Sequence, residues 1–200
     1  MLSKHDLSLI RSYERGDVTN CPFPTVTTSF YHYALDFPDA IAVRDLSSQP
    51  PRKLTYRQLC IYAQNLAKKL HWLGVGRGQR VPLLVKRGQD MIVGIWAILS
   101  CGAQYVPLDG SVVPESTLRT VIEQSDGSVV LCTSSTEQRL NDLRTHGPLI
   151  PILIDEHCRS DSGKLSNHEV LDLATADGGC YVIYTSGMMT SPGSWISHRS

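Results

Sequence analysis

The sequence predicts an α/β fold: a mainly parallel sheet flanked by helices. Short apolar runs rich in β-branched residues alternate with longer helical patterns between residues 40 and 184. Such alternation is typical of parallel strands joined by crossover helices. Neither an internal repeat nor a low-complexity tract interrupts this order. The 200 residues suffice for one domain of ordinary size, or for a piece of a larger one.

Composition and charge exclude several classes of protein. Apolar residues make up 42% of the chain, enough to bury a core, so the chain is not compositionally disordered. The 19 basic and 19 acidic residues cancel, which argues against a nucleic-acid or anionic-membrane partner. The longest apolar run, residues 91–99, is far shorter than the roughly 20 residues of a spanning helix, and no signal peptide is evident at the N-terminus. We therefore expect a cytoplasmic protein without a membrane or nucleic-acid partner.

The cysteines do not form a metal-binding or redox pattern. None of them makes a C-x-x-C pair, and several lie within apolar segments, so we expect buried free thiols in a reducing compartment. His157 and His168 lie in a polar stretch without metal-ligand spacing and are expected to be solvated, so no metal site is predicted. The six cysteines are Cys21, Cys60, Cys101, Cys132, Cys158 and Cys180.

The N-terminal part shows little regular pattern. Residues 1–28 have no clear period, and two prolines among them indicate an extended connector, so we expect an N-terminal extension there. Phe30 and Ala34 then share one face of a helix that Pro38 ends, and residues 40–43 predict a strand. A polar loop is expected over residues 47–53.

The clearest helix begins at Thr55. The spacing of Thr55 and Gln58 fits a capping box, in which each residue pairs with the backbone N–H of the other. Gly74 is a natural stop for the helix. Its core-facing stripe comprises Leu59, Ala63, Leu66, Leu70 and Leu73.

Three closely spaced glycines follow this helix: Gly74, Gly76 and Gly78. A dinucleotide-binding fingerprint would follow a strand and open a helix. These glycines instead follow a helix and precede an expected strand at residues 81–85. They therefore indicate a helix-to-strand turn.

The middle of the chain continues the alternation. Residues 91–100 are apolar all round, which indicates a helix buried on most sides. Asp109 precedes Gly110 and is expected to form a turn rather than to act as a catalytic acid. Further elements are a helix opened by Pro114, strands at 128–132 and 149–154, a helical segment at 137–144, and an irregular polar stretch at 155–179.

The segment that points to a function begins at Tyr181. Val182, Ile183 and Tyr184 predict a buried strand, which breaks into Thr185-Ser186-Gly187. Such a turn can direct hydroxyl and backbone N–H groups at a phosphate. The same residues could also form a plain strand-ending turn.

The stretch from Tyr184 onwards resembles the signature Y-T-S-G-T-T-G-x-P-K-G of acyl-adenylate-forming enzymes, most closely the adenylation domains of nonribosomal peptide synthetases. Residues 54–59 and 102–109 match two further motifs of that family, the latter G-x-x-Y-V-P-L-D. The resemblance implies that residues 29–200 form the N-terminal subdomain of an adenylation domain. His198 falls where a helix would start.

The resemblance also implies a reaction and its cofactors. Members of the family use ATP and Mg²⁺ to convert a carboxylic acid to an acyl-adenylate, and an amino acid is the substrate expected here, in secondary-metabolite peptide synthesis. The expected contacts to ATP or pyrophosphate are those of a relict phosphate loop: Thr185, Ser186, Gly187 and Thr190. Met188 and Met189 replace two hydroxyl residues, Thr190 replaces a glycine, and the lysine after Pro192 is missing, so phosphate binding is expected to be weak.

In the family the acid pocket, the metal-binding acidic residue and the catalytic lysine all lie beyond the position of Ser200. No carrier-protein segment or phosphopantetheine site is found, and no residue is assigned a catalytic or metal-binding role. We expect a truncated domain that is inactive by itself. The alternatives are a non-catalytic binding or scaffolding pseudoenzyme, and half of a split enzyme completed by a complementary adenylation-domain fragment.

Overall fold

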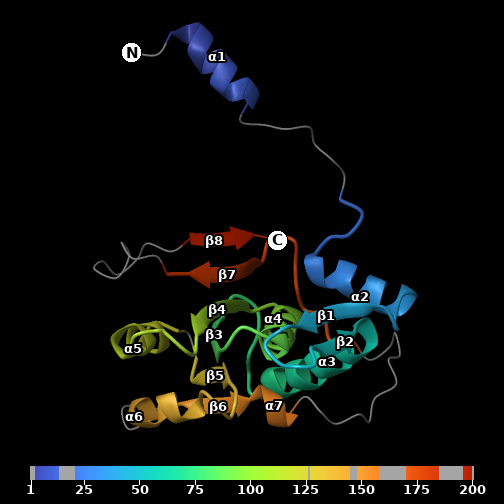
Figure 1. Cartoon of the computed structure of the whole chain (residues 1–200). Coiled ribbons are helices and arrows are strands. Elements are labelled where there is room, and N and C mark those ends of the chain that lie inside the picture. Colours follow the sequence, from blue (N-terminus) through green and yellow to red (C-terminus); the bar gives the residue numbers. More distant parts are fainter. Residues whose placement is uncertain are drawn as a thin grey trace.

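The structure, a computed structural model, describes residues 3–13, 21–125, 127–144, 148–157, 170–184 and 196–199. In these residues a six-stranded sheet has the order β6-β5-β3-β4-β7-β8 (Figure 1). The strands are β3 (Arg80–Val85), β4 (Gln104–Asp109), β5 (Val129–Cys132), β6 (Ile150–Leu153), β7 (Gly179–Ile183) and β8 (Ile196–Arg199). All neighbours pair in parallel except β8, which runs antiparallel to β7. The prediction of a mainly parallel α/β sheet is confirmed.

Helices cover both faces of this sheet (Figure 1). On one side lie α3 (Tyr56–Trp72), α4 (Gln89–Ser100) and α7 (Ile154–His157); on the other lie α5 (Glu115–Glu123), the 3₁₀ turn η1 (Glu137–Leu140) and α6 (Asn141–Arg144). The chain moves one way across the sheet from β3 to β4 and the opposite way from β4 to β5. Because such crossovers are right-handed, α4 and α5 come to lie on opposite faces.

The core follows from the alternation of side chains along the strands. Leu83 and Leu131 point into the cluster beneath α3 and α4, whereas Leu84 and Val130 point into the cluster beneath α5. All four side chains are fully buried. Runs that are apolar at every position therefore mark strands covered on both faces.

The N-terminal elements are α1 (Lys4–Tyr13), α2 (Val26–Asp36), β1 (Ile41–Asp45) and β2 (Arg52–Thr55), with β1 and β2 forming a separate antiparallel hairpin. The expectation that residues 1–28 lack regular structure is wrong at α1. Ser3 and Asp6 cap this helix reciprocally: the Asp6 N–H donates to Ser3 Oγ at 3.1 Å, and the Ser3 N–H donates to Asp6 Oδ2 at 2.8 Å. The polar loop expected at 47–53 also ends earlier than predicted, because Arg52 and Lys53 pair with β1.

The predicted boundaries of α3 are confirmed. The Gln58 N–H donates to Thr55 Oγ1 at 3.2 Å, and the Thr55 N–H donates to Gln58 Oε1 at 3.0 Å, which completes the capping box. Gly74 and Gly78 have φ of 86° and 78°, values that favour glycine. They lead directly into β3, so the glycines form the predicted helix-to-strand turn.

The end of the described chain differs from the prediction. The expectation that His198 starts a helix is wrong, because His198 lies in β8, where it pairs with Tyr181 of β7. Pairing along the edge of the sheet outweighs the local pattern at this point. Cys158 and His168 lie outside the described residues. Within the described residues, no helix is both long and apolar enough to cross a membrane.

Candidate functional site

The predicted phosphate loop is the connection between β7 and β8. Its candidate residues Thr185, Ser186, Gly187 and Thr190 lie outside the described part of the chain. The structure describes both ends of the connection, where Ile183 of β7 pairs antiparallel with Ile196 of β8. Paired residues of antiparallel strands lie about 5 Å apart. The loop therefore leaves the carboxyl end of β7 and returns beside it.

The same edge of the sheet carries the carboxyl ends of the neighbouring strands. Val85 of β3 lies beside Asp109 of β4, and Leu84 lies beside Cys132 of β5. In open parallel sheets, ligands bind outside the carboxyl ends, near the point where successive connections pass to opposite faces. That point lies between β3 and β4, which places the loop one strand away from it.

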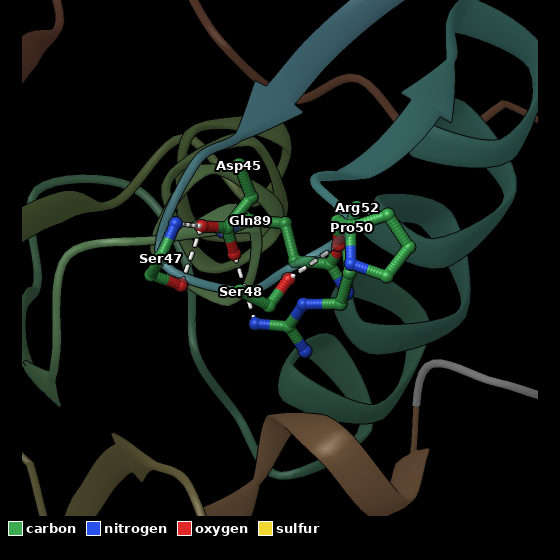
Figure 2. A network of polar contacts seen from close by, with 6 residues as sticks. All are labelled: Asp45, Ser47, Ser48, Pro50, Arg52 and Gln89. Atoms are coloured by element: carbon green, nitrogen blue, oxygen red, sulfur yellow. Dashed lines mark hydrogen bonds and ion pairs between the residues drawn. The ribbon is translucent and has the colours of Figure 1, made fainter.

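The start of α4, which follows β3 in the chain, is already occupied by a carboxylate of the chain itself. Asp45, whose side chain is 3% exposed, accepts hydrogen bonds from the Gln89 N–H at the start of α4, from the Ser47 N–H and hydroxyl, and from Arg52 (Figure 2). The two Ser47 bonds are the main reason that the pKa of Asp45 is lowered to about 2. The negative charge of Asp45 occupies the position at the helix start that an external anion would favour.

Carboxylates also accept N–H groups at the ends of β4 and β5. Asp109 Oδ1 accepts the Ser111 N–H at 2.9 Å, so Asp109 forms the predicted turn. The two oxygens of Asp155 accept the Ser134 N–H at 3.1 and 3.2 Å. An anionic ligand at either strand end would therefore meet a negative charge.

Two glutamine side chains contact the segments on either side of β7. Before the strand, Gln64 of α3 pairs with both backbone groups of Leu171: the Leu171 N–H donates to Oε1 at 2.7 Å, and Nε2 donates to the Leu171 carbonyl at 2.9 Å. After the strand, the Tyr184 hydroxyl donates to Gln124 Oε1 at 3.2 Å. Amides thus contact both flanking segments, while the ion pair of Arg77 with Asp177, at 2.6 Å, lies nearer to the start of β7.

A buried polar network supports the first of these contacts. The Tyr31 hydroxyl contacts both Gln64 and Ser100, and burial raises the pKa of the Tyr31 phenol. Asp172, next to Leu171, accepts a hydrogen bond from Thr27 at 2.8 Å. Reasoning from the sequence misses these partners, because they join residues that lie far apart in the chain and carry no local signal.

Backbone and hydroxyl groups close the sheet edge between β3 and β5. The Thr136 hydroxyl donates to the Leu84 carbonyl at 2.8 Å and accepts the Thr133 N–H at 3.1 Å. A Cβ on Gly110 would lie 2.5 Å from Thr136 Cγ2, so glycine is required there. The described part of the carboxyl edge of the sheet is therefore packed. Lys86 and Arg87, which follow β3, are exposed.

The described residues contain no cluster that could hold a metal ion, and two of their thiols are held protonated by burial. No group of three His, Cys, Asp or Glu side chains among them could hold a metal ion. The five described cysteines form no disulfide with one another: Cys60, Cys101 and Cys132 are buried, Cys180 is half-buried and Cys21 is exposed. Burial raises the pKa of the Cys60 and Cys101 thiols to about 12, which keeps them protonated and unreactive at neutral pH.

Comparisons with known proteins agree on one family. A family model described as AMP-binding enzyme matches residues 30–190. The chain is 33% identical over 193 residues to an adenylate-forming reductase of Coprinopsis cinerea, covering 96% of this chain and 18% of that protein. It is also 35% identical over 168 residues to the indigoidine synthase of Streptomyces lavendulae, covering 82% of this chain and 12% of the relative. The chain thus spans less than a fifth of the length of these relatives.

Solved structures share the fold. The nonribosomal peptide synthetase FmoA3 superposes with a TM-score of 0.73 at 21% identity, over 98% of this chain and 19% of that protein. A fatty acyl-adenylate ligase from L. pneumophila, in complex with acyl adenylate and pyrophosphate, superposes with a TM-score of 0.68 at 21% identity, over 88% of this chain and 31% of the ligase. The chain therefore has the fold of the N-terminal part of adenylation-domain structures.

Proposed function

Because the chain belongs to the family of AMP-binding enzymes, we propose that it supplies the phosphate-binding part of an adenylation domain that activates a carboxylic acid with ATP. The observation that carries the proposal is the hairpin of β7 and β8, whose connection leaves the carboxyl edge of the sheet. The N–H groups at the start of α4 and after β4 and β5 donate to carboxylates, whereas the Tyr184 hydroxyl that follows β7 donates to the amide of Gln124. Among these strand ends, that of β7 suits a phosphate best.

The proposed reaction transfers an adenylyl group. A carboxylate oxygen of the acid attacks the α-phosphorus of ATP, the bond from that phosphorus to the oxygen bridging to the β-phosphate breaks, and pyrophosphate leaves. Catalysis of such a step is mostly positioning and stabilisation of charge. In this proposal the hydroxyl and N–H groups of Thr185, Ser186, Gly187 and Thr190 would hold the departing pyrophosphate.

The described residues do not contain a set of ligands for magnesium, which the family requires. No cluster of acidic side chains forms among them. The acid pocket and the metal ligands would come from a further part of the domain, in the same polypeptide or in a complementary fragment. We accordingly propose that residues 1–200 alone do not form an acyl-adenylate.

The composition of the loop favours weak phosphate binding. Methionines at 188 and 189 offer no hydrogen-bond donors from their side chains, and no lysine follows Pro192. Loss of one preorganised donor typically slows a reaction by about 10²–10³. The same composition favours a second candidate function, a non-catalytic binding module that keeps the fold of the family.

A graft distinguishes the two candidates. Residues 30–200 would replace the matching part of an active adenylation domain, and exchange of pyrophosphate into ATP would be measured with the substrate of that domain. A second graft would carry Met188→Thr, Met189→Thr, Thr190→Gly and a lysine inserted after Pro192. We expect the repaired graft to be at least about a hundredfold faster, from the magnitude of a single donor.

Each outcome has a definite meaning. Exchange by the repaired graft alone supports the phosphate-binding role with a weakened loop. Equal rates in both grafts would show that the loop changes are neutral. A repaired graft that folds and remains inactive would contradict the adenylation proposal and favour the binding module. Exchange by residues 1–200 alone, with any amino or aryl acid, would contradict the proposed need for a further part.

A further inference from the structure

The helix α1 has an apolar side that nothing in the described chain covers. Leu7, Ile10 and Tyr13 succeed one another at intervals of three residues and are 47%, 42% and 82% exposed. Among the described elements, none packs against α1 (Figure 1). A helix of 10 residues is marginally stable in water unless its apolar side is buried. We therefore expect the apolar side of α1 to pack against another surface.

A matching surface lies where α2, β1, α3 and α4 meet. It is an apolar groove with a volume of about 370 Å³. Phe30 and Trp96 form one wall, with their rings stacked at 4.1 Å between centroids, and Tyr33 and Tyr56 contribute further aromatic surface. Tyr33 is 50% exposed and Val26 is 45% exposed, so the groove is open to solvent. The described residues leave it uncovered.

We propose that α1 docks in this groove of its own chain, with Leu7, Ile10 and Tyr13 inserted among the aromatic side chains. An amphipathic helix lying in an apolar groove, anchored by residues three or four positions apart, is a common mode of recognition. Lys4, Ser8 and Ser12 lie on the opposite side of α1 and stay in water.

The connection favours docking within one chain over docking between two copies. Val26, the first residue of α2, lines the groove, so the chain that leaves α1 returns to the rim of the groove itself. Residues 14–25 form that connection and can span up to about 40 Å when extended. A short tether within one chain gives an effective concentration in the millimolar range, far above that of a second copy in dilute solution.

Amide hydrogen exchange of the full chain tests this proposal. The reference is a synthetic peptide of residues 1–16. We expect the α1 amides to exchange at least tenfold more slowly in the full chain than in the peptide. Ile10→Asp should return them to the peptide rate. Ser8→Asp, which adds the same charge to the polar side of α1, should leave the protection in place.

Substitutions in the groove itself provide the reciprocal test of the docking proposal. Tyr33→Ala should release α1 as Ile10→Asp does, whereas Leu35→Ala, on α2 but outside the groove lining, should not. Far-UV circular dichroism and a thermal melt would verify that each variant keeps the fold.

Three results would overturn the proposal. The first is equal exchange of α1 in the chain and the peptide. The second is equal protection in the Ile10→Asp and Ser8→Asp variants. The third is protection that disappears on dilution together with a dimer in sedimentation velocity, which would place α1 in the groove of a second copy instead.

Discussion

The start of α4 and the segments that flank β7 are held in different ways. At α4, the buried carboxylate of Asp45 joins the β1–β2 hairpin to the first residue of the helix (Figure 2). At β7, the amides of Gln64 and Gln124 fix the segment before the strand and the residue after it. A carboxylate satisfies N–H groups strongly but repels an incoming anion, whereas an amide fixes the backbone without adding charge. The difference places a buried charge at the start of α4 and a neutral partner on the residue after β7.

The largest effect is expected from Gln64→Leu, which removes the side chain that pairs with both backbone groups of Leu171. A buried polar group left without a partner costs about 1–3 kcal/mol, and two are affected, so we expect a loss of about 3 kcal/mol in the free energy of unfolding. Urea denaturation would measure it, and hydrogen exchange should increase in residues 170–175. Tyr31→Phe serves as the control, because it leaves the pairing of Gln64 with Leu171 intact. If Gln64→Leu cost no more than Tyr31→Phe, Gln64 would not be what holds the entry to β7.

The contribution of the Asp45 carboxylate to the free energy of unfolding should depend on pH. The pKa of Asp45 is lowered from 3.8 to about 2 in the folded protein. Its stabilising contribution is therefore fully present above pH 4 and is lost as the pH falls through about 2. The contribution is about 2 kcal/mol. The difference in unfolding free energy between wild type and Asp45→Asn should shrink over that window. A difference that stayed constant from pH 5 to pH 2 would contradict the assignment.

Asp39→Asn is the matched control for this pH series. Asp39 is a surface carboxylate, 84% exposed, whose contact with Arg57 at 3.4 Å is open to solvent. Surface pairs of this kind contribute little, so we expect the stability at pH 7 to change by less than about 1 kcal/mol.

A smaller effect is expected at the other end of β7. Tyr184→Phe removes the hydroxyl that donates to Gln124 and should lower the free energy of unfolding by about 1 kcal/mol, since both groups are partly buried. Chemical denaturation of the single and double variants with Gln124→Ala would give the coupling between the two side chains. Strict additivity would show that their hydrogen bond does not anchor the strand.

The smallest effect is expected for Asp155→Asn. The carboxylate accepts the N–H of Ser134 at an exposed position, so the change should cost only about 0.5 kcal/mol. Titration with inorganic pyrophosphate, followed by NMR, would show whether removing this charge opens the end of β5 to anions. Binding at Ser134 in the variant, absent in the wild type, would support the view that carboxylates keep anions from this part of the edge. Equal binding in both proteins would argue against it.

Much of the fold is predictable because its signals are local. The capping box of Thr55 and Gln58, the glycines before β3, and the apolar runs of β3, β5 and β6 each depend on a few neighbouring residues. The same kind of signal exists at Ser3 and Asp6, where a reciprocal cap starts α1, although the expectation of an irregular N-terminus does not use it. The short strand β2 has little local pattern, because Arg52 and Lys53 are polar and pair with β1 only across the hairpin.

The sequence by itself determined the class of fold, the positions of α3, α4, β3, β5 and β6, and the loop that resembles a phosphate-binding signature. Only the tertiary structure decided the strand order, the assignment of His198 to β8, and the partners Gln64 and Leu171, which are 107 positions apart. Local geometry selects helices, strands and turns, since the atoms involved are covalently close. Pairing of distant strands and burial of polar groups depend on which surfaces meet when the chain is compact, and no short stretch of sequence contains that information.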